Sequence, residues 1–339
     1  MSEAPAGSVV ESTLEIARTA EAAGDYDRAV GYWRALAQMQ PKNARWAFEE
    51  ARVLRDAGRL PEAGKALTAA LQRFPRARQS EEIRAILPEL KPTVGRAIQT
   101  LGDDCPADDE LKRPAIEDED PAVDCIVARG GRKTAVVVFT GLADRMVMPL
   151  PAFDRFFAAL DLTAVYLRDR RRYGYFGGVE SLGRDYDETL AALRQKLDGL
   201  GVETVHTVGN SAGGIGAVSY GLDLGARTVL GFSAPVALTR AAAETDRRTP
   251  RFAERLLSDA VPAERRDLLA RARAAPDTAI HLFFGSEMPE DEYHARWLGE
   301  APNVTLHPLP GLAGHGALFQ VSRAKGLRPL FQEMFGAAD

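Results

Sequence analysis

The chain has 339 residues, 45% of them hydrophobic and 27% charged, a balance typical of a globular protein with room for two domains. Its net charge of −5 argues against a nucleic-acid-binding protein, and its longest apolar runs are far shorter than the ~20 residues of a membrane-spanning helix. With two cysteines, Cys105 and Cys125, no secretory signal and no metal-ligand spacing, we expect a cytoplasmic protein without a metal.

Residues 1–76 predict an all-α domain built from a repeated unit. The segments AGDYDRAVGYWRALAQMQP and AGRLPEAGKALTAALQRFP are two copies of one pattern, offset by 34 residues. Residues that recur at this offset include Ala17 and Ala51, Gly24 and Gly58, Ala29 and Ala63, and Pro41 and Pro75. A period of this length, with small residues where helices touch and proline after the second helix, resembles the tetratricopeptide repeat.

This resemblance implies helical hairpins that stack on one another and offer a surface to a peptide or protein partner, or to a second copy of the chain. A generic alanine-rich bundle is the alternative interpretation. Residues 77–121 predict a connection to a second domain. Residues 80–102 fit one or two capping helices, broken around Pro88 and Pro92, and residues 103–121 are acidic, contain proline and lack apolar periodicity, as expected of a linker.

From residue 122 to residue 339 the pattern changes to short apolar runs that alternate with helical ones. The runs cover residues 134–141, 162–169, 203–210, 227–235, 278–285 and 303–310. Runs that are apolar at nearly every position suit strands buried on both faces, as in a parallel sheet. The alternation of strand and helix therefore predicts a doubly wound α/β domain with a mostly parallel sheet.

The stretch TVGNSAGG contains a G-x-S-x-G pattern, from Gly209 to Gly213. So short a pattern is weak alone, and Ser211 has a bland interpretation as one serine in a small-residue loop. Here a predicted strand precedes it and a predicted helix follows it. A strand-to-helix turn would strain Ser211 and would require glycine on both sides, because a larger side chain would clash there. This context favours a nucleophile, and about two thirds of the chain resembles the α/β-hydrolase superfamily.

The resemblance implies a catalytic triad in the order nucleophile, acid, histidine. His315, in the glycine-rich loop after the last predicted strand, is the candidate general base, whereas the other four histidines fall in predicted strands or a helix. The superfamily usually has aspartate about three residues past the glycine of the preceding strand, but Met288 stands there. We favour Asp291 as the acid over Glu287, and a solvated acidic loop is the alternative for either.

The resemblance also implies an oxyanion hole made of two backbone N–H groups. Ala212 supplies one, and Leu142 or Gly141, in the loop after the first long apolar run, supplies the other. Residues 239–275 are helical and stand where a cap over the site is usual, although their apolar face could equally be plain core.

An arginine-rich stretch, residues 166–178, follows a predicted strand and so lies at the sheet edge where ligands bind. Arg170 and Tyr173 are therefore candidate contacts for an anionic or sugar-like substrate. Alternatively, Arg168 pairs with Asp169 and the remaining arginines are solvated.

These observations favour a serine hydrolase that acts on a carboxylic ester or thioester through an acyl-enzyme on Ser211, with His315 as the general base. Amide cleavage or acyl transfer would use the same groups. The alternative is a protein-binding scaffold whose repeats carry the function and whose hydrolase body is inert. No phosphate-binding loop or dinucleotide fingerprint is present in register, so we expect no cofactor.

Overall fold

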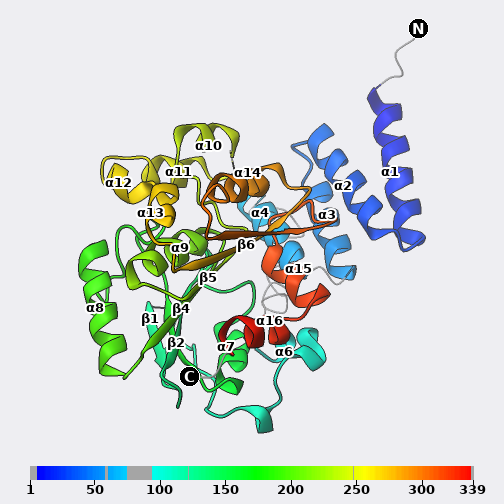
Figure 1. Cartoon of the computed structure of the whole chain (residues 1–339). Coiled ribbons are helices and arrows are strands. Elements are labelled where there is room, and N and C mark those ends of the chain that lie inside the picture. Colours follow the sequence, from blue (N-terminus) through cyan, green and yellow to red (C-terminus); the bar gives the residue numbers. More distant parts are fainter. Residues whose placement is uncertain (1–5, 58–59, 75–93, 121, 247, 337–339) are drawn as a thin grey trace. The chain divides into compact units, whose positions relative to one another are not determined.

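The computed structural model describes residues 6–57, 60–74, 94–120, 122–246 and 248–336. The chain divides into two compact units, Met1–Thr93 and Val94–Asp339, whose elements are labelled in Figure 1. This division falls within the segment that the sequence predicts as the connection.

The first unit consists of α1 (Ala6–Ala22), α2 (Tyr26–Met39), α3 (Ala44–Asp56) and α4 (Leu60–Arg73). Each helix packs on the next one in the chain. The alanines that recur in the repeat lie at these helix contacts and are fully buried: Ala17, Ala29, Ala51 and Ala63. Small residues at these places allow close helix approach, so the predicted helical-repeat organisation is confirmed. Gly58, Pro75 and residues 80–93 of the predicted capping helices lie outside the described residues.

Residues 94–120 form α6 (Val94–Leu101) and the short 3₁₀ turns η2 (Gly102–Asp104) and η3 (Asp108–Glu110). The predicted linker, residues 103–121, belongs in its described part to the second unit and packs into it. Arg113 donates to both carboxylate oxygens of Asp154, at 2.6 and 2.8 Å, and the side chain of Ile116 is buried beside this pair. The sequence did not reveal this packing because an arginine whose partner lies 41 residues away resembles a solvated charge.

The second unit is built on a seven-stranded sheet in the order β1-β3-β2-β4-β5-β6-β7. β1 is antiparallel to its neighbour and the remaining pairs are parallel. The strands are β1 (Cys125–Ala128), β2 (Thr134–Phe139), β3 (Thr163–Leu167), β4 (Thr204–Asn210), β5 (Thr228–Phe232), β6 (Ala279–Gly285) and β7 (Val304–Leu309). The six predicted runs correspond to β2–β7, whereas β1 was not predicted. The predicted doubly wound α/β architecture with a mostly parallel sheet is confirmed.

Helices cover both faces of this sheet. They are α7 (Leu150–Ala159), α8 (Tyr186–Gly199), α9 (Ala212–Leu224), α10 (Arg240–Thr245), α11 (Pro250–Leu256), α12 (Ala263–Arg266), α13 (Leu268–Ala274), α14 (Pro289–Leu298), α15 (Ala317–Ala324) and α16 (Leu327–Phe335).

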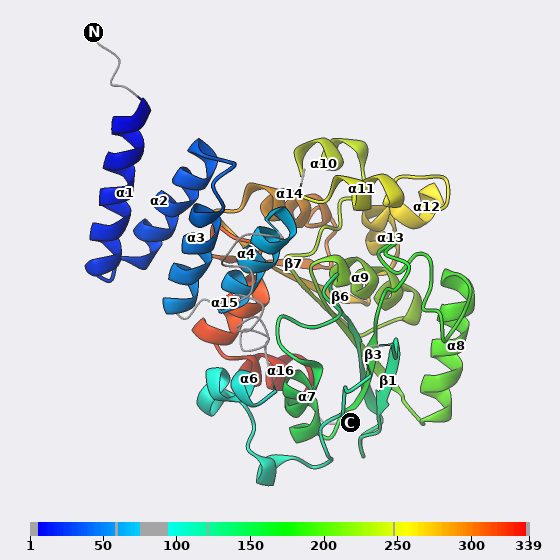
Figure 2. The ribbon, with the colours of Figure 1, turned by 180° about the vertical axis from the view of Figure 1, so that it is seen from behind.

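Alternate residues of β2 point to two separate cores. Ala135, Val137 and Phe139 pack with α8, α9, α13 and α14. Val136 and Val138 pack with α7, α15 and α16, and α7 lies beside α16 in both views (Figures 1 and 2). Burial on both faces explains why this strand is apolar from Ala135 to Phe139. Among the described residues, none of the helices combines the length and the hydropathy that a bilayer crossing requires.

Candidate active site

Ser211 occupies the turn between β4 and α9. Its φ of 55° and ψ of −128° place it in a strained region of backbone space for a residue with a side chain. The serine N–H donates to the carbonyl of Phe232 in β5, at 2.8 Å, which ties the turn to the neighbouring strand. The turn therefore lies at the carboxyl edge of the sheet, where a nucleophile elbow is expected.

The glycines on either side of Ser211 leave no room for a side chain. A Cβ on Gly209 would lie 2.2 Å from the carbonyl oxygen of Gly213, and a Cβ on Gly213 would lie 2.0 Å from that of Phe139. Both obstacles are backbone atoms of buried elements. This close approach of β4, α9 and β2 is the physical reason for glycine at both positions of the motif.

His315 and Asp291 lie beside Ser211 in a continuous chain of hydrogen-bonding groups. His315 Nε2 is 2.7 Å from Ser211 Oγ, and His315 Nδ1 is 2.8 and 3.1 Å from the two carboxylate oxygens of Asp291. A proton on Nδ1, donated to Asp291, leaves the Nε2 lone pair facing the serine hydroxyl. The structure thus brings together the predicted nucleophile, base and favoured acid. Glu287 is exposed, and no hydrogen bond or ion pair joins its side chain to His315 among the described residues.

Asp291 belongs to the first turn of α14, and His315 to the loop between β7 and α15, which we call the histidine loop (Gly311–Gly316). Burial by itself would raise the pKa of the Asp291 carboxyl, but the hydrogen bonds and charges of His315 and Arg248 outweigh it and lower the pKa. Asp291 is therefore an ionised carboxylate beside the imidazole. Arg248, which no sequence motif indicates, is the second charged group in contact with Asp291.

Two of the candidate oxyanion donors, Ala212 and Gly141, lie beside the serine. Gly141 closely approaches the elbow, since a Cβ there would lie 3.6 Å from Ser211 Cβ. The N–H of Gly141 points to the carbonyl of Arg145, at 3.4 Å, so it is engaged within its own loop. The N–H groups of Leu142 and Ala212 make no backbone hydrogen bond to another described residue. Of the two predicted donors in this loop, Gly141 is thus engaged and Leu142 has no backbone partner among the described residues.

The arginine-rich stretch after β3 holds this same loop. Arg172 donates to both carboxylate oxygens of Asp144, at 3.1 and 2.9 Å, and Arg170 lies 3.5 Å from that carboxylate. Arg168 donates to the carbonyl of Asp144 and pairs with Asp118 at 2.6 Å. Arg168 thus pairs with Asp118, not Asp169, and the arginines that contact Asp144 stabilise the loop after β2.

Asp169 and Tyr173 have separate surroundings. The Asp169 carboxylate accepts the N–H of Tyr175 at 3.1 Å, and burial raises the pKa of this carboxyl. Tyr173 is half-buried, and the guanidinium of Arg255 in α11 lies 5.7 Å from its ring centroid. Tyr173 therefore lies against the segment predicted as a cap.

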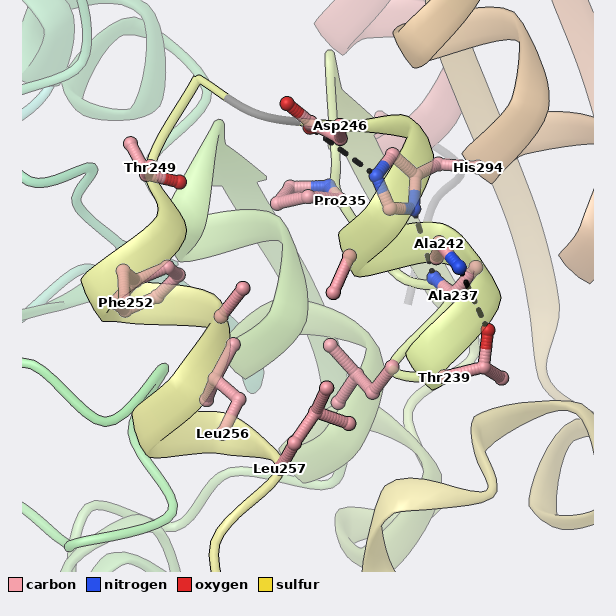
Figure 3. Close-up of a pocket in the computed structure, with 13 residues that line it drawn as sticks. Pro235, Ala237, Thr239, Ala242, Asp246, Thr249, Phe252, Leu256, Leu257 and His294 are labelled. Carbon is pink, nitrogen blue, oxygen red and sulfur yellow. Dashed lines mark hydrogen bonds and ion pairs between the residues drawn. The ribbon is translucent and has the colours of Figure 1, made fainter.

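The cap segment (residues 239–275) contributes both to the core and to a pocket. Leu268 and Ala272 of α13 are buried in the core on one face of the sheet. α10, α11 and the loop after β5 surround a mostly apolar pocket, shown in Figure 3. At its polar side, His294 of α14 lies between Asp246 and the backbone of Ala237. Among the described residues, no group of three or more His, Cys, Asp and Glu side chains is arranged to hold a metal ion.

Residues 14–78 match the family model of the tetratricopeptide repeat. The N-terminal unit carries tetratricopeptide-like repeats. A search of curated proteins found no match to the sequence. Similar solved structures include a carboxylesterase of Nitrososphaera gargenis, at 13% identity, 62% coverage of this chain, 93% coverage of that chain and a TM-score of 0.42.

Two further similar structures are the capsule O-acetyltransferase of Neisseria meningitidis serogroup A and an alpha/beta hydrolase from a sediment metagenome of the Mar Chica lagoon. The first is 16% identical, with 62% of this chain and 89% of that chain covered and a TM-score of 0.42. The second is also 16% identical, with 64% and 97% covered and a TM-score of 0.43.

Proposed function

We propose that the second unit is a serine hydrolase that cleaves a carboxylic ester or thioester through an acyl-enzyme on Ser211. The observation that carries this proposal is the uninterrupted chain from Ser211 Oγ through the His315 imidazole to the Asp291 carboxylate, with contacts of 2.7 and 2.8 Å. A serine hydroxyl is a poor nucleophile until a base removes its proton, and this arrangement supplies the base.

In the first half of the reaction, Ser211 Oγ attacks the acyl carbon while its proton passes to His315 Nε2. The N–H groups of Ala212 and Leu142 receive the negative charge that develops on the carbonyl oxygen. The bond to the alcohol or thiol then breaks, and this leaving group takes the proton from Nε2. In the second half, a water molecule gives its proton to Nε2 and attacks the acyl-enzyme, which releases the acid and restores Ser211.

Arg170 and Tyr173 are our candidates for substrate contact beside this centre. The Arg170 side chain is 26% exposed, and its Nη1 lies 3.5 Å from the Asp144 carboxylate. Its Nη2 is buried and has no hydrogen-bond partner among the described residues. An alcohol in place of water would turn the same steps into acyl transfer. We also propose a cytoplasmic location, which fits two cysteines that are not joined to each other.

For the first unit we propose binding of a peptide or protein partner, or of a second copy of the chain, because tetratricopeptide repeats present such surfaces. This role is compatible with hydrolysis by the second unit. An inert hydrolase body with a binding function alone is the competing proposal, and it predicts no turnover.

The test is hydrolysis of a chain-length series of aryl acyl esters by the full chain and by Ser211→Ala. We expect the substitution to lower kcat by roughly 10⁶ because it removes the nucleophile. Ser322→Ala is the matched control, since among the described residues that hydroxyl bonds the carbonyl of Phe319 in its own helix and no other group. Equal turnover by the folded wild type and Ser211→Ala would refute Ser211 as the nucleophile.

A further inference from the structure

Arg248 connects the cap segment to the acid and the base. It lies between α10 and α11, and its Nη1 is 2.7 Å from Asp291 Oδ1 and 2.7 Å from His315 Nδ1. The Asp291 side chain is 1% exposed and that of Arg248 is 25% exposed. The Arg248 guanidinium is thus in direct contact with both the acid and the base.

Arg248 is itself held in place from the other side. Its Nε and Nη2 donate to the two carboxylate oxygens of Asp246, at 2.8 and 2.6 Å, in the bidentate geometry that is strongest for this pair. The cation therefore cannot rotate away from Asp291 without breaking a paired contact.

His294 in turn supports Asp246. The N–H of Ala237 donates to His294 Nδ1 at 3.1 Å, which leaves the proton of the neutral ring on Nε2, and Nε2 lies 3.3 Å from Asp246 Oδ2. The His294 side chain is buried. Asp246, Arg248 and His294 form a polar network behind the acid, which we call the supporting network.

Two hydrogen-bond donors converge on Asp291. Its Oδ1 receives Arg248 Nη1 and also lies 2.8 Å from His315 Nδ1. Both donors are satisfied only while Asp291 is ionised and keeps this orientation. The supporting network thus orients the carboxylate, which belongs to α14 and lies beyond the position that is usual for the acid.

Arg248 also contacts the base, since its Nη1 is 2.7 Å from His315 Nδ1. The charged groups that the described residues place around His315 are Arg248 and Asp291 in direct contact, with Asp246 behind Arg248. Glu287 follows β6, and its backbone N–H bonds the carbonyl of Leu312 in the histidine loop.

We propose that Arg248 is a positioning residue for the Asp291–His315 pair, which holds the Asp291 carboxylate in the orientation that accepts from His315. This inference rests on the proposed function of the site. It assigns to the cap segment a direct influence on the acid–base pair, beyond any role in binding substrate.

The experiment compares kcat and KM of Arg248→Gln, Arg248→Lys and the wild type for an aryl ester. Because Arg248 acts through Asp291, Arg248→Gln should lower kcat by about 10–100-fold and leave KM nearly unchanged. Arg248→Lys keeps a charged donor and should restore part of kcat. The matched control is Arg251→Gln, an exposed arginine of α11.

A second readout needs no turnover. The proton between His315 Nδ1 and Asp291 should give a downfield ¹H NMR signal, assigned by its loss in His315→Gln. This signal should move in Arg248→Gln and keep its position in Arg251→Gln. An unmoved signal or an unchanged kcat in Arg248→Gln would overturn the inference. A moved signal in a protein that does not hydrolyse the ester would uphold the role of Arg248 and count against the proposed reaction.

Discussion

Gly213→Ala is the sharpest structural test of the elbow. The new Cβ would lie 2.0 Å from the carbonyl oxygen of Phe139 and 2.7 Å from that of Thr140, whereas real contacts of this kind stay beyond 3.0 Å. The two backbone segments must therefore separate by about 1 Å. Overpacking a core costs about 1–3 kcal/mol, and we take the upper end because both obstacles are backbone atoms of a buried strand and its loop.

A loss of about 3 kcal/mol corresponds to a fall in Tm of roughly 6–12 °C for a unit of this size. The assay is thermal unfolding of the full chain, followed by circular dichroism, together with ester turnover. Gly199→Ala is the control, because no atom lies within 4 Å of its added Cβ and alanine is the better helix former. A Gly213→Ala protein that melts with the wild type and keeps its turnover would refute the steric account of the elbow.

Three further substitutions test the packing, the site and its charges. Asp154→Ala leaves the buried Arg113 cation without its carboxylate partner and should lower the free energy of unfolding in urea by about 3–5 kcal/mol. Asp108→Ala removes a carboxylate that is 92% exposed and should lower it by less than about 1 kcal/mol. Equal losses in the two variants would contradict this. Ser233→Ala removes the acceptor for the first N–H of α15, at 3.2 Å, and should lower both Tm and kcat by loosening the histidine loop; unchanged values would contradict this. The pKa of Asp246 is lowered because the hydrogen bonds of its partners outweigh its burial. Its contribution to stability is thus present above the ordinary aspartate pKa of about 3.9 and lost as pH falls through the folded pKa. Asp246→Asn should therefore lower Tm at pH 7, and its Tm should fall less than that of the wild type when the pH is lowered. Equal falls in Tm on acidification for the two proteins would contradict this.

The sheet and the repeats were predictable from sequence because their signals are local. Strands buried on both faces are apolar at nearly every position, as β2 is from Ala135 to Phe139, and the buried alanines recur at a fixed offset. The four-residue β1 was missed because it is short and only partly buried.

The candidate nucleophile and base were found through a short motif and its order along the chain, whereas the acid was open between two carboxylates. Only the start of α14 at Pro289 decides which of them lies inward, since it places Asp291 in the first turn and leaves Glu287 exposed. No sequence pattern distinguishes Arg248 as a residue of the site. It is one arginine among many in a helical segment, and its partner Asp291 lies 43 residues away.

The same limit applies to residues 103–120. Acidic residues and prolines without periodicity indicate a linker, yet Arg113 and Ile116 within them are buried. Charges that are paired across long sequence separations are satisfied by the tertiary structure, and composition alone cannot distinguish them from solvated ones.

The most direct test of the central claim is covalent labelling of the full chain with a fluorophosphonate, read by mass spectrometry of the intact protein and its peptides. If Ser211 is the nucleophile, we expect one adduct per chain, on the peptide that contains Ser211, and none in Ser211→Ala. Absence of an adduct on the folded wild type, or an adduct that persists in Ser211→Ala, would contradict it.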